Sequence, residues 1–206
     1  MTADRPLIVL VAPDSFKGSL TAVEVARALA AGWARARPRD EILLAPLADG
    51  GEGTLVAIEV AGGWTVETAT VHDPLGREIQ ARWLRSLDGT RAVVEMAEAS
   101  GLSRVAPSER DPVAATSVGT GEVMRIAALA GATRMIVGIG GSATTDGGEG
   151  LLRGLAGDEG IDRPPSVAHT IALEVACDVT NPLHGPDGAA AVYGPQKGAT
   201  PEQVRA

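Results

Sequence analysis

The chain has 206 residues, of which 45% are hydrophobic and 21% charged, and its formal net charge is -8. This length fits one large or two small globular domains. The negative charge and the 2% aromatic content argue against nucleic acids and anionic membranes, which are bound through cationic groups and stacking rings. The single cysteine, Cys177, excludes an intrachain disulfide and a cysteine-cluster metal site, and its apolar neighbours favour burial. The N-terminal apolar run is too short for a signal peptide or membrane span, so we expect a cytoplasmic protein.

The first sixty residues predict the order β-loop-α-β-loop-α. Residues 7–11 form an apolar run without polar alternation, which is typical of a strand buried on both faces in a parallel sheet. Thr21 and Glu24 have the spacing of a capping box, which predicts a helix over 22–36. A second strand is expected within 41–46, and a short helix follows the loop after it.

An antiparallel meander is predicted after Gly62–Gly63, where that short helix ends. Polar and apolar residues alternate there between tight turns, which predicts strands at 65–71, 78–84 and 91–96. We therefore expect two α/β domains. Residues 1–62 begin a parallel domain whose completion is expected beyond residue 206, and residues 63–206 form a second domain.

The remaining elements are expected at the following positions: a helix over 119–130, strands at 135–137 and 171–176, an irregular linker at 156–170 and a helix start at Thr200–Gln203.

The loop Ala12–Ser19 lies between the first predicted strand and the first predicted helix. It contains a carboxylate, two hydroxyls and an ammonium, at Asp14, Ser15, Ser19 and Lys17. Open α/β sheets bind ligands at the carboxyl ends of their parallel strands. A lysine beside the amides that open a helix favours an anion, and phosphate is the commonest one.

The loop Gly138–Gly148 combines five glycines with one serine and two threonines. Successive glycine amides after a buried strand can form a concave donor site for phosphate oxygens, although a ligand-free tight turn is the alternative. The dinucleotide fingerprint G-x-G-x-x-A, with Asp158 as its acid, also fits the spacing. This interpretation is disfavoured because Asp146–Gly148 interrupts the start of a helix and no strand delivers Asp158. A Walker A motif is absent, which makes a P-loop kinase improbable.

Further polar residues follow the other predicted strands. Asp49 and Glu52 could hold Mg²⁺ or orient a substrate hydroxyl. Alternatively, Glu52 is a negative charge at a helix N-terminus, which the helix dipole stabilises without any ligand. Asp178 and Asn181 follow a buried strand in the same way. Lys197 is either a phosphate-binding ammonium or a solvated loop lysine.

Taken together, these motifs resemble the bacterial ATP-dependent glycerate kinases over nearly the whole chain. The segments that carry the resemblance are Ala12–Ser19, Pro46–Thr54, Ala97–Leu102, Thr116–Glu122, Gly138–Gly148, Cys177–Leu183 and Gly194–Ala199. The resemblance implies a flavodoxin-like domain combined with a restriction-endonuclease-like domain, one inserted in the other. Members of this family are longer than this chain and continue past Lys197.

The resemblance implies that MgATP phosphorylates a hydroxyl of D-glycerate, giving 2-phosphoglycerate or, in some members, 3-phosphoglycerate. Lys17 would neutralise a phosphate or the glycerate carboxylate, and Asp14 or Asp49 would orient or deprotonate the hydroxyl. The catalytic candidates are Asp14, Lys17 and Asp49. The substrate- or phosphate-binding candidates are Ser15, Ser19, Gly50, Gly51, Glu52, Gly140, Gly141, Ser142, Thr144, Asp146, Asp178, Asn181 and Lys197. No metal ligand is assigned.

Two other functions stay open at this point. The chain could bind nucleotide or glycerate without turning it over, or it could be a nicotinamide-dependent oxidoreductase built on the Gly138–Gly148 loop. The sequence also leaves open whether the protein forms homo-oligomers.

Overall fold

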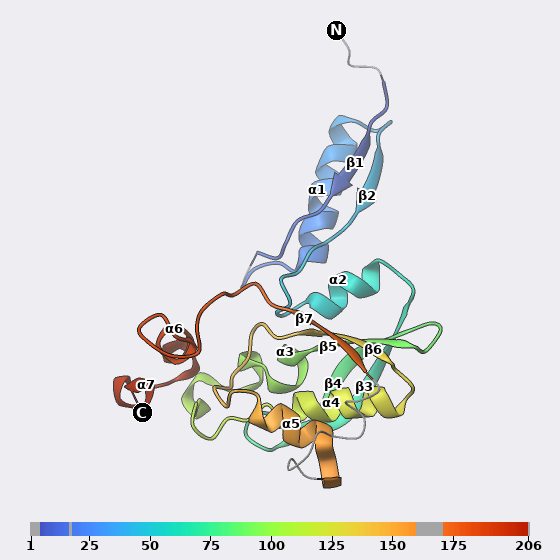
Figure 1. Ribbon diagram of the computed structural model, residues 1–206. Coiled ribbons are helices and arrows are strands. Elements are labelled where there is room, and N and C mark those ends of the chain that lie inside the picture. The colour runs from blue at the N-terminus through green and yellow to red at the C-terminus, as the bar shows by residue number, and fades with distance from the viewer. Residues whose placement is uncertain (1–4, 17, 160–170, 206) are drawn as a thin grey trace. The chain divides into compact units, whose positions relative to one another are not determined.

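The computed structural model describes residues 5–16, 18–159 and 171–205 (Figure 1). The chain forms two compact units, each described separately below. Unit 1 comprises Met1–Ala48 and Gly53–Gly63, and unit 2 comprises Asp49–Glu52 and Trp64–Ala206. A parallel two-stranded sheet and a mixed five-stranded sheet, both accompanied by helices, confirm the predicted α/β class.

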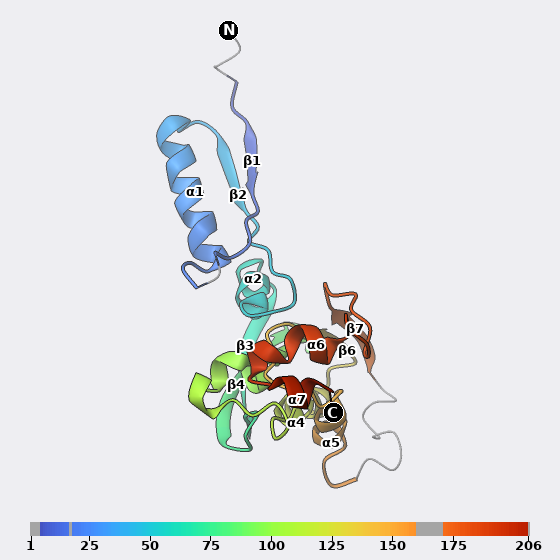
Figure 2. The ribbon, with the colours of Figure 1, turned by 90° about the vertical axis from the view of Figure 1, so that its left-hand side faces the viewer.

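Unit 1 is a β-α-β element followed by a short helix. Its elements are β1 (Ile8–Val11), α1 (Ala22–Ala36), β2 (Glu41–Leu44) and α2 (Thr54–Val60). The two strands pair in parallel, with Ile8 opposite Glu41 and Val11 opposite Leu44. Figure 2 shows α1 running alongside this strand pair.

The boundaries of α1 agree with the prediction because the sequence caps this helix. The Thr21 hydroxyl accepts a hydrogen bond from the Glu24 backbone N–H at 3.3 Å, and a Glu24 carboxylate oxygen accepts one from the Thr21 backbone N–H at 2.8 Å. These bonds satisfy two backbone donors that a helix start otherwise leaves unpaired. After the helix, Asp40 accepts bonds from the side chains of Arg37 and Trp33.

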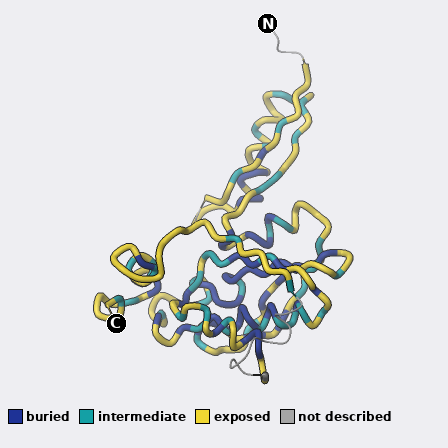
Figure 3. Tube along the Cα trace, viewed as in Figure 1, coloured by how far each residue is buried: buried dark blue, intermediate teal, exposed yellow. Residues whose placement is uncertain are grey.

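The prediction that β1 is buried on both faces is wrong for this structure. Val11 is buried, whereas Ile8 is 72% exposed and Leu10 64% exposed. Successive side chains of a strand point to opposite faces, and α1 covers one face of this sheet. Most of unit 1 is accordingly exposed or half-buried in Figure 3. An apolar run identifies a strand but does not show what covers its second face.

Unit 2 is built on a five-stranded sheet with the strand order β3-β4-β5-β6-β7. The first three strands are antiparallel, and β5, β6 and β7 are parallel. Its strands are β3 (Trp64–His72), β4 (Glu78–Ser86), β5 (Arg91–Glu95), β6 (Arg134–Gly138) and β7 (Ala172–Ala176). Its α-helices are α3 (Met96–Ser100), α4 (Val118–Leu129), α5 (Glu149–Ala156), α6 (Ala189–Tyr193) and α7 (Pro201–Arg205). Its 3-10 turns are η1 (Leu102–Arg104), η2 (Pro107–Glu109), η3 (Gly157–Glu159) and η5 (Pro195–Lys197).

The core of unit 2 lies between the sheet and α4, and α5 packs on α4 (Figures 1 and 3). Two glycines allow the helix backbones to touch. A Cβ atom at Gly121 would lie 2.0 Å from the Leu151 carbonyl oxygen, and one at Gly154 would lie 2.1 Å from the Val118 carbonyl oxygen. The buried core residues are Ala69, Val71, Ala81, Trp83, Ala92, Val94, Ala99, Val123, Met124, Ala127, Ala132, Met135, Val137 and Leu155.

The parallel strands of unit 2 end side by side. Glu95 at the end of β5 lies opposite Gly138 at the end of β6, and Gly138 lies opposite Ala176 at the end of β7. The loops that leave these ends therefore start from one edge of the sheet, where open α/β sheets place their ligands. Most of the predicted linker 156–170 falls outside the described residues. Within the described part of the chain, no helix has the length and apolarity needed to cross a membrane.

Candidate active site

The centre of the candidate site is a contact between two glycine pairs of unit 2. The Gly140 backbone N–H donates to the Gly50 carbonyl oxygen at 3.0 Å. A Cβ atom at Gly140 would lie 2.6 Å from Gly51 Cα, and one at Gly138 would lie 2.5 Å from the Gly50 carbonyl oxygen. Such distances exclude any side chain, so the two loops pack backbone against backbone.

Gly50 is further restricted by its own conformation and by β7. Its φ of 91° lies in the left-handed region, where side chains other than glycine's are strained. A Cβ atom there would also lie 2.6 Å from the Ala176 carbonyl oxygen. We call Gly50, Gly51, Gly140, Gly141 and Ser142 the phosphate cradle after their predicted role, which stays a prediction. Gly50 and Gly51 are buried, Gly140 and Ser142 are half-buried, and Gly141 is exposed.

The loop Gly138–Gly148, here the Gly-rich loop, is fastened to the segment after α3. The Gly141 carbonyl oxygen accepts a bond from Leu102 N–H at 2.8 Å. Ala143 N–H donates to the Ser100 carbonyl oxygen at 2.9 Å, and Gly101 and Ser142 form an isolated antiparallel bridge. This backbone pairing fixes the middle of the loop.

Asp146 fastens the C-terminal part of the Gly-rich loop to two helices. Its Oδ2 atom accepts bonds from the Ser117 backbone N–H (2.7 Å), the Ser117 hydroxyl (2.8 Å) and Gly150 N–H (3.2 Å). Its Oδ1 atom accepts one from Gly148 N–H at 3.1 Å. Burial alone would raise the pKa of Asp146, but the hydrogen bonds from Ser117, Gly148 and Gly150 outweigh it and lower the pKa. Both carboxylate oxygens are thus used by the protein itself.

Lys197 reaches the Gly-rich loop from η5, far along the chain. Its ammonium donates to the Ser142 hydroxyl at 2.8 Å and to the Thr144 carbonyl oxygen at 2.6 Å. The side chain is only 9% exposed, and burial lowers its pKa, while the charge of Asp146 partly opposes the shift. Of the two interpretations offered by the sequence, a solvated loop lysine is wrong.

The acidic residues beside the cradle remain accessible. Asp49 and Glu52 are both exposed. One oxygen of Asp49 accepts a bond from Gly51 N–H at 2.8 Å, which fixes the carboxylate against the cradle backbone. Among the described residues, no group of three or more His, Cys, Asp and Glu side chains could hold a metal ion.

The two candidates after β7 differ in what their side chains contact. Asn181 donates to the Asp187 carbonyl oxygen at 2.9 Å and accepts from the Tyr193 hydroxyl at 2.6 Å, so its amide connects its loop to α6. Asp178 is exposed. Cys177, expected to be buried, is exposed as well, because it follows a strand at the edge of the sheet.

Three of the candidates from the first loop lie in unit 1. Ser15 N–H donates to an Asp14 carboxylate oxygen, and Ser19 N–H donates to the Phe16 carbonyl oxygen at 2.8 Å. Asp14, Ser15 and Ser19 are all exposed. Lys17 lies outside the described residues.

Two residues that lie against the Gly-rich loop were not among the predicted site residues. Ser117 links Asp146 to α5, because its hydroxyl also accepts a bond from Leu151 N–H at 2.8 Å. Glu95, 4% exposed, ends β5 directly opposite Gly138. Ser117 could have been found because it lies in the motif Thr116–Glu122, which carries part of the family resemblance. Glu95 could have been found because it is a charged residue at the end of a predicted strand.

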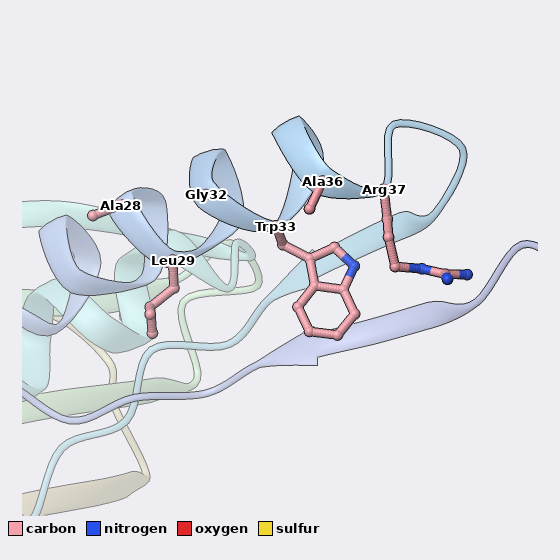
Figure 4. A pocket seen from close by; sticks show the side chains of 6 residues that line it. All are labelled: Ala28, Leu29, Gly32, Trp33, Ala36 and Arg37. Carbon is pink, nitrogen blue, oxygen red and sulfur yellow. The ribbon is translucent and has the colours of Figure 1, made fainter. Parts of the chain in front are cut away.

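Unit 1 also carries a shallow hollow on α1, shown in Figure 4. It is lined by apolar helix residues together with Arg37. The Arg37 guanidinium is paired with Asp40, and the hollow offers no other charged group. Its chemistry does not match that of an anion site.

Comparison with known proteins identifies the family. The Glycerate kinase family model matches residues 9–164 and 160–206. The chain is 42% identical to the glycerate kinase of Haemophilus influenzae and to the glycerate 2-kinase of Escherichia coli, over 95% of this chain and 57% of each relative. A crystal structure proposed to be a glycerate kinase 2 from Salmonella typhimurium LT2 matches with a TM-score of 0.82 and 43% identity, over 98% of this chain and 59% of that one. The chain spans somewhat more than half the length of these relatives, and it belongs to the glycerate kinase family.

Proposed function

We propose that the protein is a glycerate kinase that transfers the γ-phosphoryl group of ATP to D-glycerate. Family membership supports this reaction class, and relatives from several bacteria are named glycerate kinases. The name of the Escherichia coli relative, glycerate 2-kinase, favours 2-phosphoglycerate as the product. Transfer to the other hydroxyl, giving 3-phosphoglycerate, is the alternative.

The observation that carries the proposal is the phosphate cradle. Its glycines meet backbone against backbone, with Gly140 N–H bonded to Gly50. A glycine loop held in this way can bring backbone N–H groups close to phosphate oxygens, and Gly141 is the exposed member of the cradle. Phosphoryl transfer needs little covalent chemistry from a protein and depends on positioning and charge neutralisation.

The residues present fit MgATP as the cofactor pair. Mg²⁺ usually takes one or two protein carboxylates, with waters and substrate phosphates completing its shell. Asp49 and Glu52 are accessible carboxylates beside the cradle, so a larger protein ligand set is unnecessary. When bound, the ion would neutralise charge on the transferring phosphate.

The proposed roles of the acids and of Lys17 follow from their chemistry. Asp49 or Asp14 would accept a hydrogen bond from the glycerate hydroxyl and take its proton during transfer. Lys17 would neutralise a phosphate or the glycerate carboxylate. The cradle would hold the phosphates in place.

The proposal is tested by following ATP and D-glycerate with the protein by ³¹P NMR. The expected result is loss of ATP with growth of a phosphomonoester signal, and the 2-phospho and 3-phospho products are distinguished by their spectra. Calorimetry with each ligand is run in parallel. Binding without any product would contradict the kinase and support the binding protein that the sequence left open. Neither binding nor product would overturn both functions.

A further inference from the structure

Lys197 is one of only two lysines among the 18 lysine and arginine residues of the chain. Arginine is the chain's usual cation, but the two side chains are not interchangeable. A lysine ammonium is a compact charge with three donors, whereas an arginine guanidinium is a wide planar fork. The Lys197 Nζ atom lies 2.8 Å from the Ser142 hydroxyl oxygen and 2.6 Å from the Thr144 carbonyl oxygen. A compact cation can bridge two acceptors so close together in sequence.

The turn that carries Lys197 is itself fixed. The Arg110 guanidinium donates to the Gln196 carbonyl oxygen at 3.1 Å. Gly198, with φ of 100°, packs so closely on Arg110 that a Cβ atom would lie 3.0 Å from Arg110 Cβ. The Gly-rich loop is held to the same region, because the Thr145 hydroxyl donates to the Pro112 carbonyl oxygen at 2.7 Å. Lys197 therefore connects η5 to the Gly-rich loop, and both of these segments also bond to the segment Arg110–Pro112.

The environment of the ammonium is costly for a charge. The side chain is buried, and its two hydrogen-bond acceptors are neutral oxygens. Asp146 is the carboxylate that acts on it electrostatically, and both Asp146 oxygens already accept bonds from backbone and Ser117. Arg110, whose guanidinium donates to the Gln196 carbonyl oxygen in the same turn, adds no negative charge to the surroundings of the ammonium. A buried charge with weak compensation is unfavourable for stability alone, so a role in function is a natural reason for keeping it.

Resting on the proposed function, we infer that Lys197 is a positioning residue that holds the Gly-rich loop in its phosphate-binding shape before any ligand arrives. Its bonds to Ser142 and Thr144 lie directly after the cradle glycines Gly140 and Gly141. A loop that is already ordered binds its ligand without first paying the ordering entropy. In this account Lys197 acts through the loop and does not contact the phosphates itself.

The first test is hydrogen exchange of the ligand-free protein. In Lys197→Met, amides of residues 138–148 should exchange at least about tenfold faster, because the loop opens more often. Amides of the β3–β4 hairpin should be unchanged. Lys197→Arg should restore part of the protection, since it keeps a charged donor. Arg205→Met, which removes an exposed cation, is the control and should leave the loop unchanged.

The second test compares loop opening with the affinity for inorganic tripolyphosphate, measured by calorimetry. If Lys197 only positions the loop, Lys197→Met should raise the Kd for tripolyphosphate only by the factor by which the fraction of closed loop falls. That fraction is calculated from the exchange rates, and the two factors should agree within about threefold. Unchanged loop exchange together with a tenfold loss of affinity would overturn the inference and make Lys197 a direct phosphate ligand.

A further variant keeps the inference testable if Lys197→Met does not fold. Ser142→Ala removes one acceptor and leaves the lysine, and it should speed exchange of the loop by a smaller factor. In a folded double variant, Ser142→Ala should add little to Lys197→Met, because both remove the same link. If the two substitutions had fully additive effects on the exchange rate of the loop, the proposed link between Lys197 and Ser142 would be contradicted. Since exchange needs no turnover, these results stand even if the protein fails to phosphorylate glycerate.

Discussion

At the scale of single residues, the glycines of the Gly-rich loop have different reasons for being glycine. Gly138 and Gly140 face the backbone of Gly50 and Gly51 at distances that exclude a Cβ atom. Gly147, in the same loop, has a positive φ of 62° but open space around it. The first kind of glycine is required for contact and the second for backbone conformation.

This difference gives a matched pair of substitutions. Gly140→Ala should lower the free energy of unfolding by about 3 kcal/mol, the upper part of the range for overpacking. Gly147→Ala should cost about 1 kcal/mol, the strain of a left-handed alanine. Urea denaturation of both variants measures the difference. Equal losses would mean that the contact between the two loops does not exclude a side chain.

Asp146 should contribute stability that depends on pH. Because its folded-state pKa lies below the usual 3.8, its contribution is complete above pH 3.8 and is lost as the pH falls through the folded-state value. Asp146→Asn should therefore cost about 1.5–3 kcal/mol near neutral pH, the range for hydrogen bonds to a charged group. The deficit should shrink as denaturation is repeated below pH 3.8. Glu149→Gln, at an exposed ion pair with Arg153, should change stability by less than about 0.5 kcal/mol.

Lys17 is the residue whose proposed role is most directly catalytic. Lys17→Ala should lower kcat for glycerate phosphorylation by about 10²–10³-fold, as expected when a charge-stabilising group is removed. Lys17→Arg should retain part of the rate because it keeps the charge. Arg27→Ala, an exposed cation on α1, serves as the control. A near-normal rate in Lys17→Ala would remove this residue from the active site.

At the scale of elements, local signals in the sequence predicted most helices and strands. The helix over 22–36 is correct to the residue, because Thr21 and Glu24 form the cap that the spacing indicates. The helix start at Thr200 is also correct, with its hydroxyl bonded to Gln203 N–H. By contrast, the helix Glu149–Ala156 was not predicted. Glycines at its start are typical of a loop and do not indicate a helix. In the structure, Asp146 and Ser117 accept hydrogen bonds from the first backbone N–H groups of this helix.

The contacts that build the site could not be predicted in the same way. Lys197 and Ser142 are 55 residues apart, and Asp146 and Ser117 are 29 residues apart. Periodicity and capping rules describe only neighbours in the sequence. The sequence therefore predicted a Gly-rich ligand loop but not the bonds that hold it. It also could not show that the Asn181 amide bonds to Asp187 and to Tyr193 of α6.

The cap of α1 gives a prediction at this scale. Thr21→Ala removes the hydroxyl that accepts the Glu24 N–H bond, and should lower the stability of unit 1 by about 1 kcal/mol. Thr21→Ser keeps an equivalent acceptor, so its stability should stay close to that of the unchanged protein. Denaturation followed by far-ultraviolet circular dichroism measures both. An unchanged alanine variant would show that packing alone sets the start of this helix.

At the scale of the whole molecule, the two units differ in how completely they are packed. Unit 2 has a continuous core between its sheet and α4. In unit 1, Ile8 and Leu10 are exposed on the strand face away from α1. This exposure supports the proposal that residues 1–62 are the first part of a larger parallel domain. That domain assignment, with residues 63–206 as the second domain, stays a prediction.

The central claim is that the phosphate cradle binds the phosphates of ATP, and hydrogen exchange with and without MgATP tests it most directly. The account predicts that MgATP slows exchange of amides in residues 138–148 and around Gly50 and Gly51, whereas MgCl₂ alone does not. Binding of MgATP that protects other parts of the chain and leaves these two loops unchanged would contradict the claim.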